Sequence, residues 1–242
     1  MIKKFKSPNA VINLLGPFTI LQTIHNLSED QNITDKGYRR LFIQGVCVKA
    51  LWIIEKIKEF NPDCVPIIML EEPMLAQFGN IRRENEEVTS DLITGMYEKI
   101  TEKLKSSGAI VGVQCFDKCD WQIPINGGID IISFDAYNNP NNLNIIPEQI
   151  TEFIARGGKI NWGIVPVMSE ETVKSLNIAY LTKRLLSTMQ GLIVAGVPST
   201  YVYKSALVSC QNDLYLPIIF AEKAIILTSQ LSKKIPSKPI EN

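Results

Sequence analysis

The residues of this sequence best suited to chemistry are its cysteines and the acidic residues that follow its apolar runs. The cysteines are Cys47, Cys64, Cys115, Cys119 and Cys210. An odd number of cysteines favours free thiols or metal ligands over a disulfide framework. We therefore expect reduced thiols in this chain.

Two of these cysteines lie close together but in different settings. Cys115 ends the apolar run 109–115, and Cys119 lies beyond it in a loop. Side chains alternate along a strand, so Cys115 should face away from the side on which Gln114 and Phe116 lie. A free cysteine usually packs as a small apolar residue. We predict that Cys115 is buried, whereas Cys119 has the freedom of a loop to approach other groups.

A pair of adjacent acids, Glu71 and Glu72, ends another apolar run just before Pro73. Neighbouring residues of a strand point to opposite faces, so only one of the two can face the interior of a barrel. A buried carboxylate is usually paired with a Lys or Arg.

Length and composition favour one globular domain. The chain has 242 residues, of which 45% are hydrophobic and 21% charged, enough for one sizeable core. We predict a single domain over residues 1–231. The segment 232–242 contains two prolines and little to bury, and we expect it to be a flexible tail.

Charge and hydropathy limit the partners. Twenty-five basic residues balance 25 acidic ones, so we expect no binding to nucleic acid or to an anionic membrane surface. No apolar segment approaches the roughly 20 residues needed to span a bilayer. The first residues lack the pattern of a signal peptide, which favours the cytoplasm. A small molecule or another protein is the expected partner.

Short apolar runs alternate with amphipathic helical patterns, which is typical of repeated βα units and a parallel sheet. Val88, Leu92, Met96, Ile100 and Leu104 recur at helical spacing and predict one such helix. The Ile- and Val-rich runs predict six strands, at residues 10–15, 65–70, 109–115, 129–134, 159–165 and 206–210.

Six motifs follow one another along the chain: Leu15–Thr19, Leu70–Pro73, Gln114–Trp121, Gly128–Tyr137, Arg156–Pro166 and Val208–Gln211. Their order resembles that of one superfamily, which contains the cobalamin-independent methionine synthase C-terminal domain and uroporphyrinogen decarboxylase. The resemblance covers roughly residues 10 to 230 and implies an α/β fold of the TIM (β/α)₈ type, with its active site at the carboxyl ends of the strands.

The resemblance also implies that the barrel is incomplete. In that family the Gly-Pro motif follows the third strand, so the six predicted strands correspond to strands three to eight. A barrel without its first two strands has two open edges. We expect a homo-oligomer or a partner protein chain to cover the gap, through the first strand and the last helix around Phe220 and Ile225.

Members of the family bind zinc through a His-x-Cys pair, a carboxylate on the next strand and a Cys on the last strand. By position these ligands correspond to Gln114, Phe116, Asp135 and Cys210. Only Asp135 and Cys210 suit zinc, which prefers thiolate, imidazole and carboxylate. The resemblance therefore implies a possible but weakened zinc site, to which Cys119 could add a ligand.

The same resemblance implies roles for other residues. Glu71 and Asp135 are the candidate catalytic residues, and Glu71 would contact the amino group of an amino-acid substrate. Gln114 and Trp121 are candidate substrate-binding residues. The implied reaction is methyl transfer from a folate or corrinoid donor to a thiol, assisted by zinc.

Two further readings stay open. The alternative prediction is a non-catalytic barrel subunit that binds a partner protein supplying the missing strands, because both the His-x-Cys pair and two strands are absent. Porphyrin decarboxylation ranks last, since it needs clustered arginines. Only Arg39, Arg40, Arg82, Arg83, Arg156 and Arg184 are available, and the resemblance would put such a cluster in the missing first part of the barrel.

Overall fold

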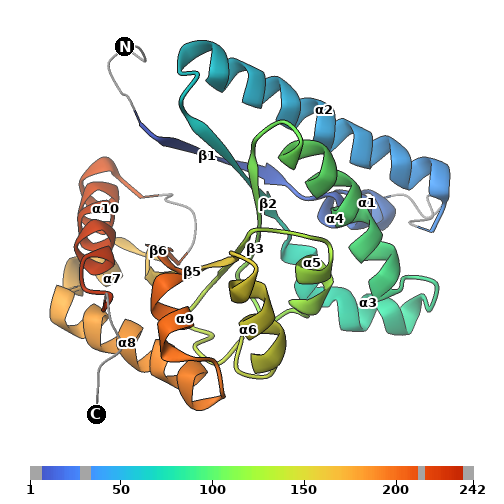
Figure 1. The fold of residues 1–242 in the computed structure, drawn as a ribbon. Helices are drawn as coiled ribbons and strands as arrows, with labels where there is room; N and C mark the ends of the chain where they lie inside the picture. The colour runs from blue at the N-terminus through green and yellow to red at the C-terminus, as the bar shows by residue number, and fades with distance from the viewer. Residues whose placement is uncertain (1–6, 28–33, 212–215, 237–242) are drawn as a thin grey trace. The chain divides into compact units, whose positions relative to one another are not determined.

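The computed structural model describes residues 7–27, 34–211 and 216–236, and they form an α/β fold. Six parallel strands, interleaved with helices, follow the order β1-β2-β3-β4-β5-β6 over the described residues (Figure 1). This confirms the predicted fold class, six βα units of an incomplete TIM-type barrel. The strands are Asn9–Leu15, Val65–Glu71, Ile110–Cys115, Ile131–Phe134, Lys159–Val165 and Ala206–Cys210.

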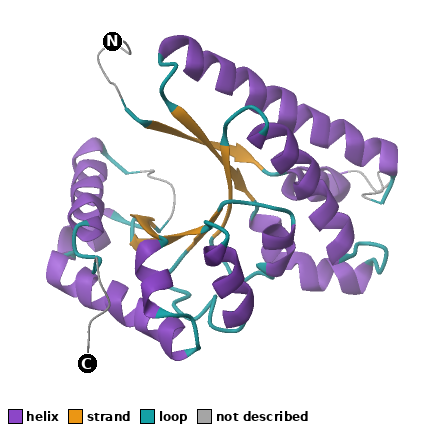
Figure 2. Cartoon of the chain, viewed as in Figure 1, coloured by secondary structure: helices purple, strands orange, loops and turns teal. Residues whose placement is uncertain are grey.

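Helices separate the strands along the chain (Figure 2). A short 3₁₀ helix, η2, covers Pro73–Gln77. The α-helices are α1 Pro17–Leu27, α2 Lys36–Phe60, α3 Phe78–Glu84, α4 Ser90–Lys105, α5 Gln122–Asn126, α6 Pro147–Ala155, α7 Glu170–Ser175, α8 Ile178–Val194, α9 Ser199–Lys204 and α10 Ile218–Ser232.

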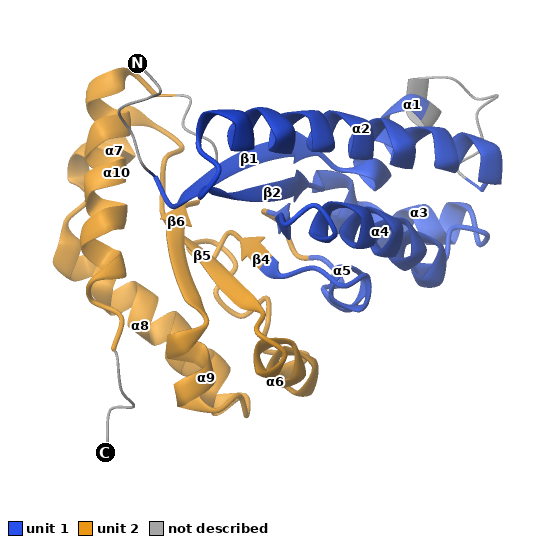
Figure 3. Cartoon of the chain, turned by 45° about the horizontal axis from the view of Figure 1, so that its top comes forward, with its two compact units in different colours: residues 1–115, 119–131 blue, residues 116–118, 132–242 orange. Residues whose placement is uncertain are grey.

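The chain divides into two compact units (Figure 3). Unit 1 contains residues 1–115 and 119–131, and unit 2 contains residues 116–118 and 132–242. The single domain over residues 1–231 stays a prediction, because compactness alone does not show whether the units fold independently. Of the predicted tail, Ser232 ends α10, and residues 237–242 lie outside the described part.

The predicted strands agree with the structure to within two residues. The ranges of β5 and β6 are those expected, whereas β4 begins at Ile131 and not at residue 129. The difference arises at Gly128, whose φ of 81° lies in the left-handed region that favours glycine. This turn delays the start of the strand.

In unit 1, helix α4 shows how the sequence positions a helix. Thr89 caps its first turn by accepting a hydrogen bond from the backbone N–H of Leu92. Its buried face includes Met96, Ile100 and Leu104, as the helical spacing predicted, and packs against β3 and α2. The capping residue and the apolar stripe together fix both the start and the orientation of the helix.

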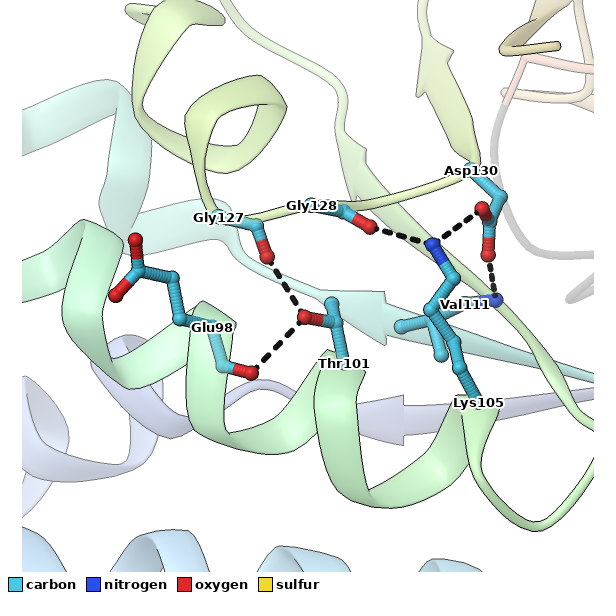
Figure 4. A network of polar contacts seen from close by, with 7 residues as sticks. All are labelled: Glu98, Thr101, Lys105, Val111, Gly127, Gly128 and Asp130. Atoms are coloured by element: carbon cyan, nitrogen blue, oxygen red, sulfur yellow. Dashed lines mark hydrogen bonds and ion pairs between the residues drawn. The ribbon is translucent and has the colours of Figure 1, made fainter. Parts of the chain in front are cut away.

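A polar network joins the last turns of α4 to the loop before β4 (Figure 4). The Thr101 hydroxyl donates to the carbonyl of Gly127 at 2.8 Å. Lys105 donates to the carbonyl of Gly128 at 2.9 Å and pairs with Asp130 at 2.6 Å. Asp130 in turn accepts from the backbone N–H of Val111 at 3.0 Å. The loop is thereby tied to both the helix and β3.

Unit 2 is organised in the same way around α8. The Asn177 side chain caps its first turn, and a stripe of Leu181, Leu185, Met189 and Leu192 is fully buried. The helix packs against β5, and α10 packs against β6. No helix among the residues described is long and apolar enough to cross a membrane.

The network in Figure 4 predicts the effect of one substitution. Thr101→Val keeps the shape of the side chain but removes the donor to Gly127. Because Thr101 is buried, the loss should lower the free energy of unfolding by about 1–3 kcal/mol. Urea denaturation measures it.

The matched control is Thr182→Val in α8, whose hydroxyl donates only to the carbonyl one turn earlier, at Ile178. The Ile178 carbonyl also accepts a backbone hydrogen bond within α8. Thr182→Val should therefore lower the free energy of unfolding by less than Thr101→Val does. An equal loss in both variants would contradict the role given to the Gly127 bond.

Candidate functional site

The carboxyl ends of β1, β2 and β3 bring two of the predicted site residues together in unit 1. Leu15 pairs in register with Glu71, and Glu71 with Gln114. Residues in register on neighbouring strands share a face, so Glu71 and Gln114 form one row. Both are half-buried. Glu71 and Gln114, two of the residues predicted to contact the substrate, are therefore adjacent.

The opposite face of β3 carries Cys115. Its side chain is buried, at 1% exposure, which confirms the predicted orientation. Cys119 follows in the loop and its thiol contacts that of Cys115, while burial raises its pKa well above the usual value. A neutral, desolvated thiol is a poor nucleophile and a poor metal ligand.

Trp121 is packed inside unit 1. Its side chain is 1% exposed, and its indole N–H has no hydrogen-bond partner among the described residues. In this arrangement the ring is part of the core and offers no open face to a ligand. Its predicted role in substrate binding stays a prediction.

Glu72, to which the sequence patterns assign no role, is the more deeply buried of the two adjacent acids in unit 1. Its carboxylate is fully buried at the first turn of α1 and accepts backbone N–H bonds from Phe18 at 3.1 Å and Thr19 at 2.8 Å. The Thr19 hydroxyl donates to it at 2.6 Å. A Cβ at Gly16 would lie 2.2 Å from this carboxyl, so glycine is required there. The Gly16-Pro17 and Glu72-Pro73 motifs therefore contact each other in the interior of unit 1.

Burial raises the pKa of Glu72 from its ordinary 4.5 to about 7. The hydrogen bonds from Thr19 and Phe18, together with the nearby Tyr97 hydroxyl, act in the opposite direction. No Lys or Arg is among these contacts. The amino end of α1 supplies the donors to Glu72 in place of a basic side chain.

Unit 2 holds a second polar cluster, centred on Asp135. The carboxylate is 5% exposed and accepts from the backbone and side chain of Asn138, both at 2.8 Å. Gln211 Nε2 donates to it at 2.8 Å. The amide oxygen of Gln211 is buried and has no partner among the described residues. This oxygen is an acceptor that a bound donor could satisfy.

A polar row lies beside this cluster on β4, β5 and β6. Asn161 Nδ2 donates to Ser133 Oγ and to Ser209 Oγ, each at 2.9 Å. The alternate residues face the other way, where the rings of Phe134 and Trp162 stack edge-on at 5.4 Å. In unit 2, one face of the sheet is therefore polar and the other is core.

Cys210 lies on the opposite side of β6 from Gln211. Its sulfur is 3.6 Å from the Thr228 hydroxyl of α10, and burial raises the pKa of the thiol. Asp135 thus meets Gln211 and not Cys210. The structure does not bring these two predicted zinc ligands together.

The residues present do not fit a zinc ion in this arrangement. Zinc needs three or four converging ligands. Among the residues the structure describes, no three His, Cys, Asp or Glu side chains gather closely enough to hold a metal. The oxygens of Asp135 are already bound by amides. The carbonyl of Phe116, at another expected ligand position, accepts from Asn139.

Comparison with known proteins adds no family to this picture. The sequence matches no family model and no curated protein. The resemblance to the methionine synthase superfamily therefore rests on the ordered motifs and stays a prediction.

Glu72 predicts a pH dependence of stability. The unfolded carboxyl titrates near 4.5 and the folded one near 7, so the folded chain binds more protons between these values. The contribution to the free energy of unfolding is present below pH 4.5 and is lost as the pH rises to about 7, by on the order of 3 kcal/mol. Urea denaturation at pH 5 and pH 8 measures the loss.

Glu72→Gln removes the titrating group and should reduce the difference between the two pH values. Glu102→Gln, at an exposed position of α4, is the matched control and should leave the difference as in the wild type. A Glu72→Gln protein with the wild-type difference would show that another group is responsible.

The geometry around Asp135 and Cys210 predicts substoichiometric zinc. Protein purified without chelators should contain well under one zinc per chain by elemental analysis, and Cys210→Ala should leave the content unchanged. One zinc per chain that disappears in Cys210→Ala would contradict the arrangement described here.

Proposed function

We propose that this protein is a barrel subunit completed by another protein chain, which adds a parallel strand beside β1 and a helix against α2. The observation that supports the proposal best is the outward side of unit 1, where an unpaired strand edge adjoins an apolar helix face. We call the exposed residues of β1 and α2 the docking face. It consists of Val11, Leu15, Leu41, Gly45, Val48 and Trp52.

The hydrogen bonds of β1 identify its free edge. Val65 N donates to Pro8 O at 2.9 Å, and Gly16 N donates to Glu71 O at 2.8 Å. Peptide groups alternate in direction along a parallel strand, so even-numbered residues of β1 bond to β2. The peptide groups of Val11 and Asn13 then point to the open side, toward no described strand. Unpaired backbone groups of this kind are a template for a further strand.

Helix α2 is apolar on two faces. Its buried face includes Val46, Ala50 and Ile54, and packs in unit 1 against α4, β1 and β2. A second apolar stripe is exposed: Val48 at 68% and Trp52 at 59%, in line with Leu41. Spacings of seven and four residues put these side chains on one side of a helix. A stripe of this width is typical of a helix that contacts a partner.

A groove of about 380 Å³ connects the strand edge to the helix. It is lined by Leu14 and Leu15 of β1, Ile20 of α1, and the Leu41 to Lys49 segment of α2. At Gly45 a side chain would meet nothing within 4 Å. In a βα barrel each helix packs beside the helix of the preceding unit. The groove therefore suits the helix that would follow an added strand.

The other predicted contact was the last helix. In unit 2, Ile225 of α10 is 56% exposed, and the Phe220 ring is covered by the Lys174 ammonium at 4.8 Å. Leu207 of β6 is also exposed. These residues support a second contact with the same partner. Five free cysteines support a reducing location, and we place the subunit in the cytoplasm.

Photocrosslinking in the native cells tests the proposal. A photoreactive residue at position 45 should form a crosslink to one other protein, at a strand–helix segment of that protein, and Trp52→Glu should abolish the product. The same group at position 99, on the exposed side of α4, is the control. A crosslink to a second copy of this chain, or no product above the control, would overturn the proposal.

The second candidate is the thiol methyl transfer that the resemblance implies, with a folate or corrinoid donor. The observation that favours it is the adjacency of Glu71 and Gln114 at the strand ends. In this reading Glu71 binds the substrate ammonium and Gln114 contacts the substrate. The roles that the resemblance implies for Trp121 and Asp135 stay predictions. The chain's own residues supply no zinc site in the described arrangement, so we ascribe no step to a metal. One zinc per chain that is lost in Cys210→Ala would favour this candidate over the first, because the reaction that the resemblance implies is assisted by zinc.

A further inference from the structure

Unit 2 contains a basic pocket that neither proposal uses. It has a volume of about 370 Å³ and lies between the loop that follows β4 and the first turns of α8. That volume falls in the range of small-molecule sites. The residues that matter for its chemistry are Asn141, Tyr180, Lys183, Arg184 and Ser187.

Helical spacing gathers the polar side chains of the pocket. Lys183, Arg184 and Ser187 follow Tyr180 by three, four and seven residues, so the four residues share one side of α8. The buried stripe that begins at Leu181 occupies the opposite side. The helix therefore directs two cations, a phenol and a hydroxyl toward the loop.

The guanidinium of Arg184 is fixed in place. It stacks over the ring of Tyr137 at 4.6 Å and donates through Nη2 to the Tyr137 carbonyl. Its Nε–H is buried and has no acceptor among the described residues. A buried donor without a partner is costly, so a ligand acceptor that reached it would be stabilising.

The charge of the pocket is uncompensated in the described part of the chain. No carboxylate lines it, and the ion pairs found involve Lys56, Lys105 and Lys174. Lys183 is exposed beside Arg184, so two positive charges converge with the Ser187 hydroxyl and the Asn141 amide. Two cations with neutral donors are suited to a doubly charged oxyanion.

We propose that this pocket binds the phosphate group of a small phosphorylated molecule. Arg184 and Lys183 neutralise the phosphate, and Ser187 and Asn141 donate to its remaining oxygens. The pocket exceeds the size of a phosphate ion, and the half-exposed ring of Tyr180 offers a surface for the rest of the molecule. The pocket shares no residue with the docking face, so it stands or falls independently of the proposed function.

Calorimetric titration of the full chain with inorganic phosphate, at constant ionic strength, tests the proposal. Saturable binding of one phosphate per chain is expected. Lys183→Ala should weaken it about tenfold, the value of one charge-assisted hydrogen bond. Arg184→Lys keeps the charge but loses the planar fork, and should weaken binding by at least as much.

Lys99→Ala, at an exposed lysine of α4, is the matched control and should bind as the wild type does. Thermal unfolding of Arg184→Lys checks that the fold survives, and Lys183→Ala provides the test if it does not. Absence of saturable binding, or equal binding in Lys183→Ala and Lys99→Ala, would overturn the proposal. Tighter binding of succinate than of phosphate would overturn the choice of phosphate.

Discussion

Alternation along parallel strands is the constraint on which the features of this protein depend. Successive side chains face opposite sides of a sheet, and successive peptide groups face opposite edges. In unit 1 this places Glu71 in a row with Gln114 and sends Glu72 to the buried first turn of α1. In β1 it leaves the peptide groups of Val11 and Asn13 on the open side.

The same alternation decides the chemistry of unit 2. Gln211 bonds to Asp135, so Cys210 must turn the other way, toward Thr228 on α10. The polar face of the sheet is then satisfied by amides and hydroxyls and not by thiolates. A carboxylate surrounded by amide donors orients and hydrogen-bonds well, but it has few lone pairs left for a metal. The unit is accordingly better suited to binding neutral donors than to holding zinc.

Local patterns were sufficient to predict the strands, the apolar stripe of α4 and the burial of Cys115, because each depends on neighbours in sequence. Glu72 could not be assigned in this way. Its donors, at Phe18 and Thr19, lie more than 50 residues away, and only the packing of α1 against the end of β2 brings them near. The motif resemblance selected Cys210 by position, whereas the register of β6 brings Gln211 to Asp135.

The exposed stripe of α2 was visible in the sequence as apolar residues at Leu41, Val48 and Trp52, seven and four residues apart. Helical stripes usually face a core, and α2 already has one buried face. Sequence alone cannot tell which of the two apolar stripes of α2 packs in the core and which is exposed to contact a partner. The groove that Leu41 shares with Leu14 and Leu15 of β1 links one end of the exposed stripe to the strand edge, which favours this stripe as the one that a partner contacts.

Amide hydrogen exchange along β1 tests the central claim most directly. In the isolated chain, the amides of Val11 and Asn13 should exchange much faster than those of Ile12 and Leu14, which bond to β2. Addition of the partner protein identified by crosslinking should slow hydrogen exchange at the amides of Val11 and Asn13. It should leave exchange at the two amides that bond to β2 unchanged. Equal protection of all four amides in a monomeric, isolated chain would contradict the account, because it would mean that β1 has no open edge.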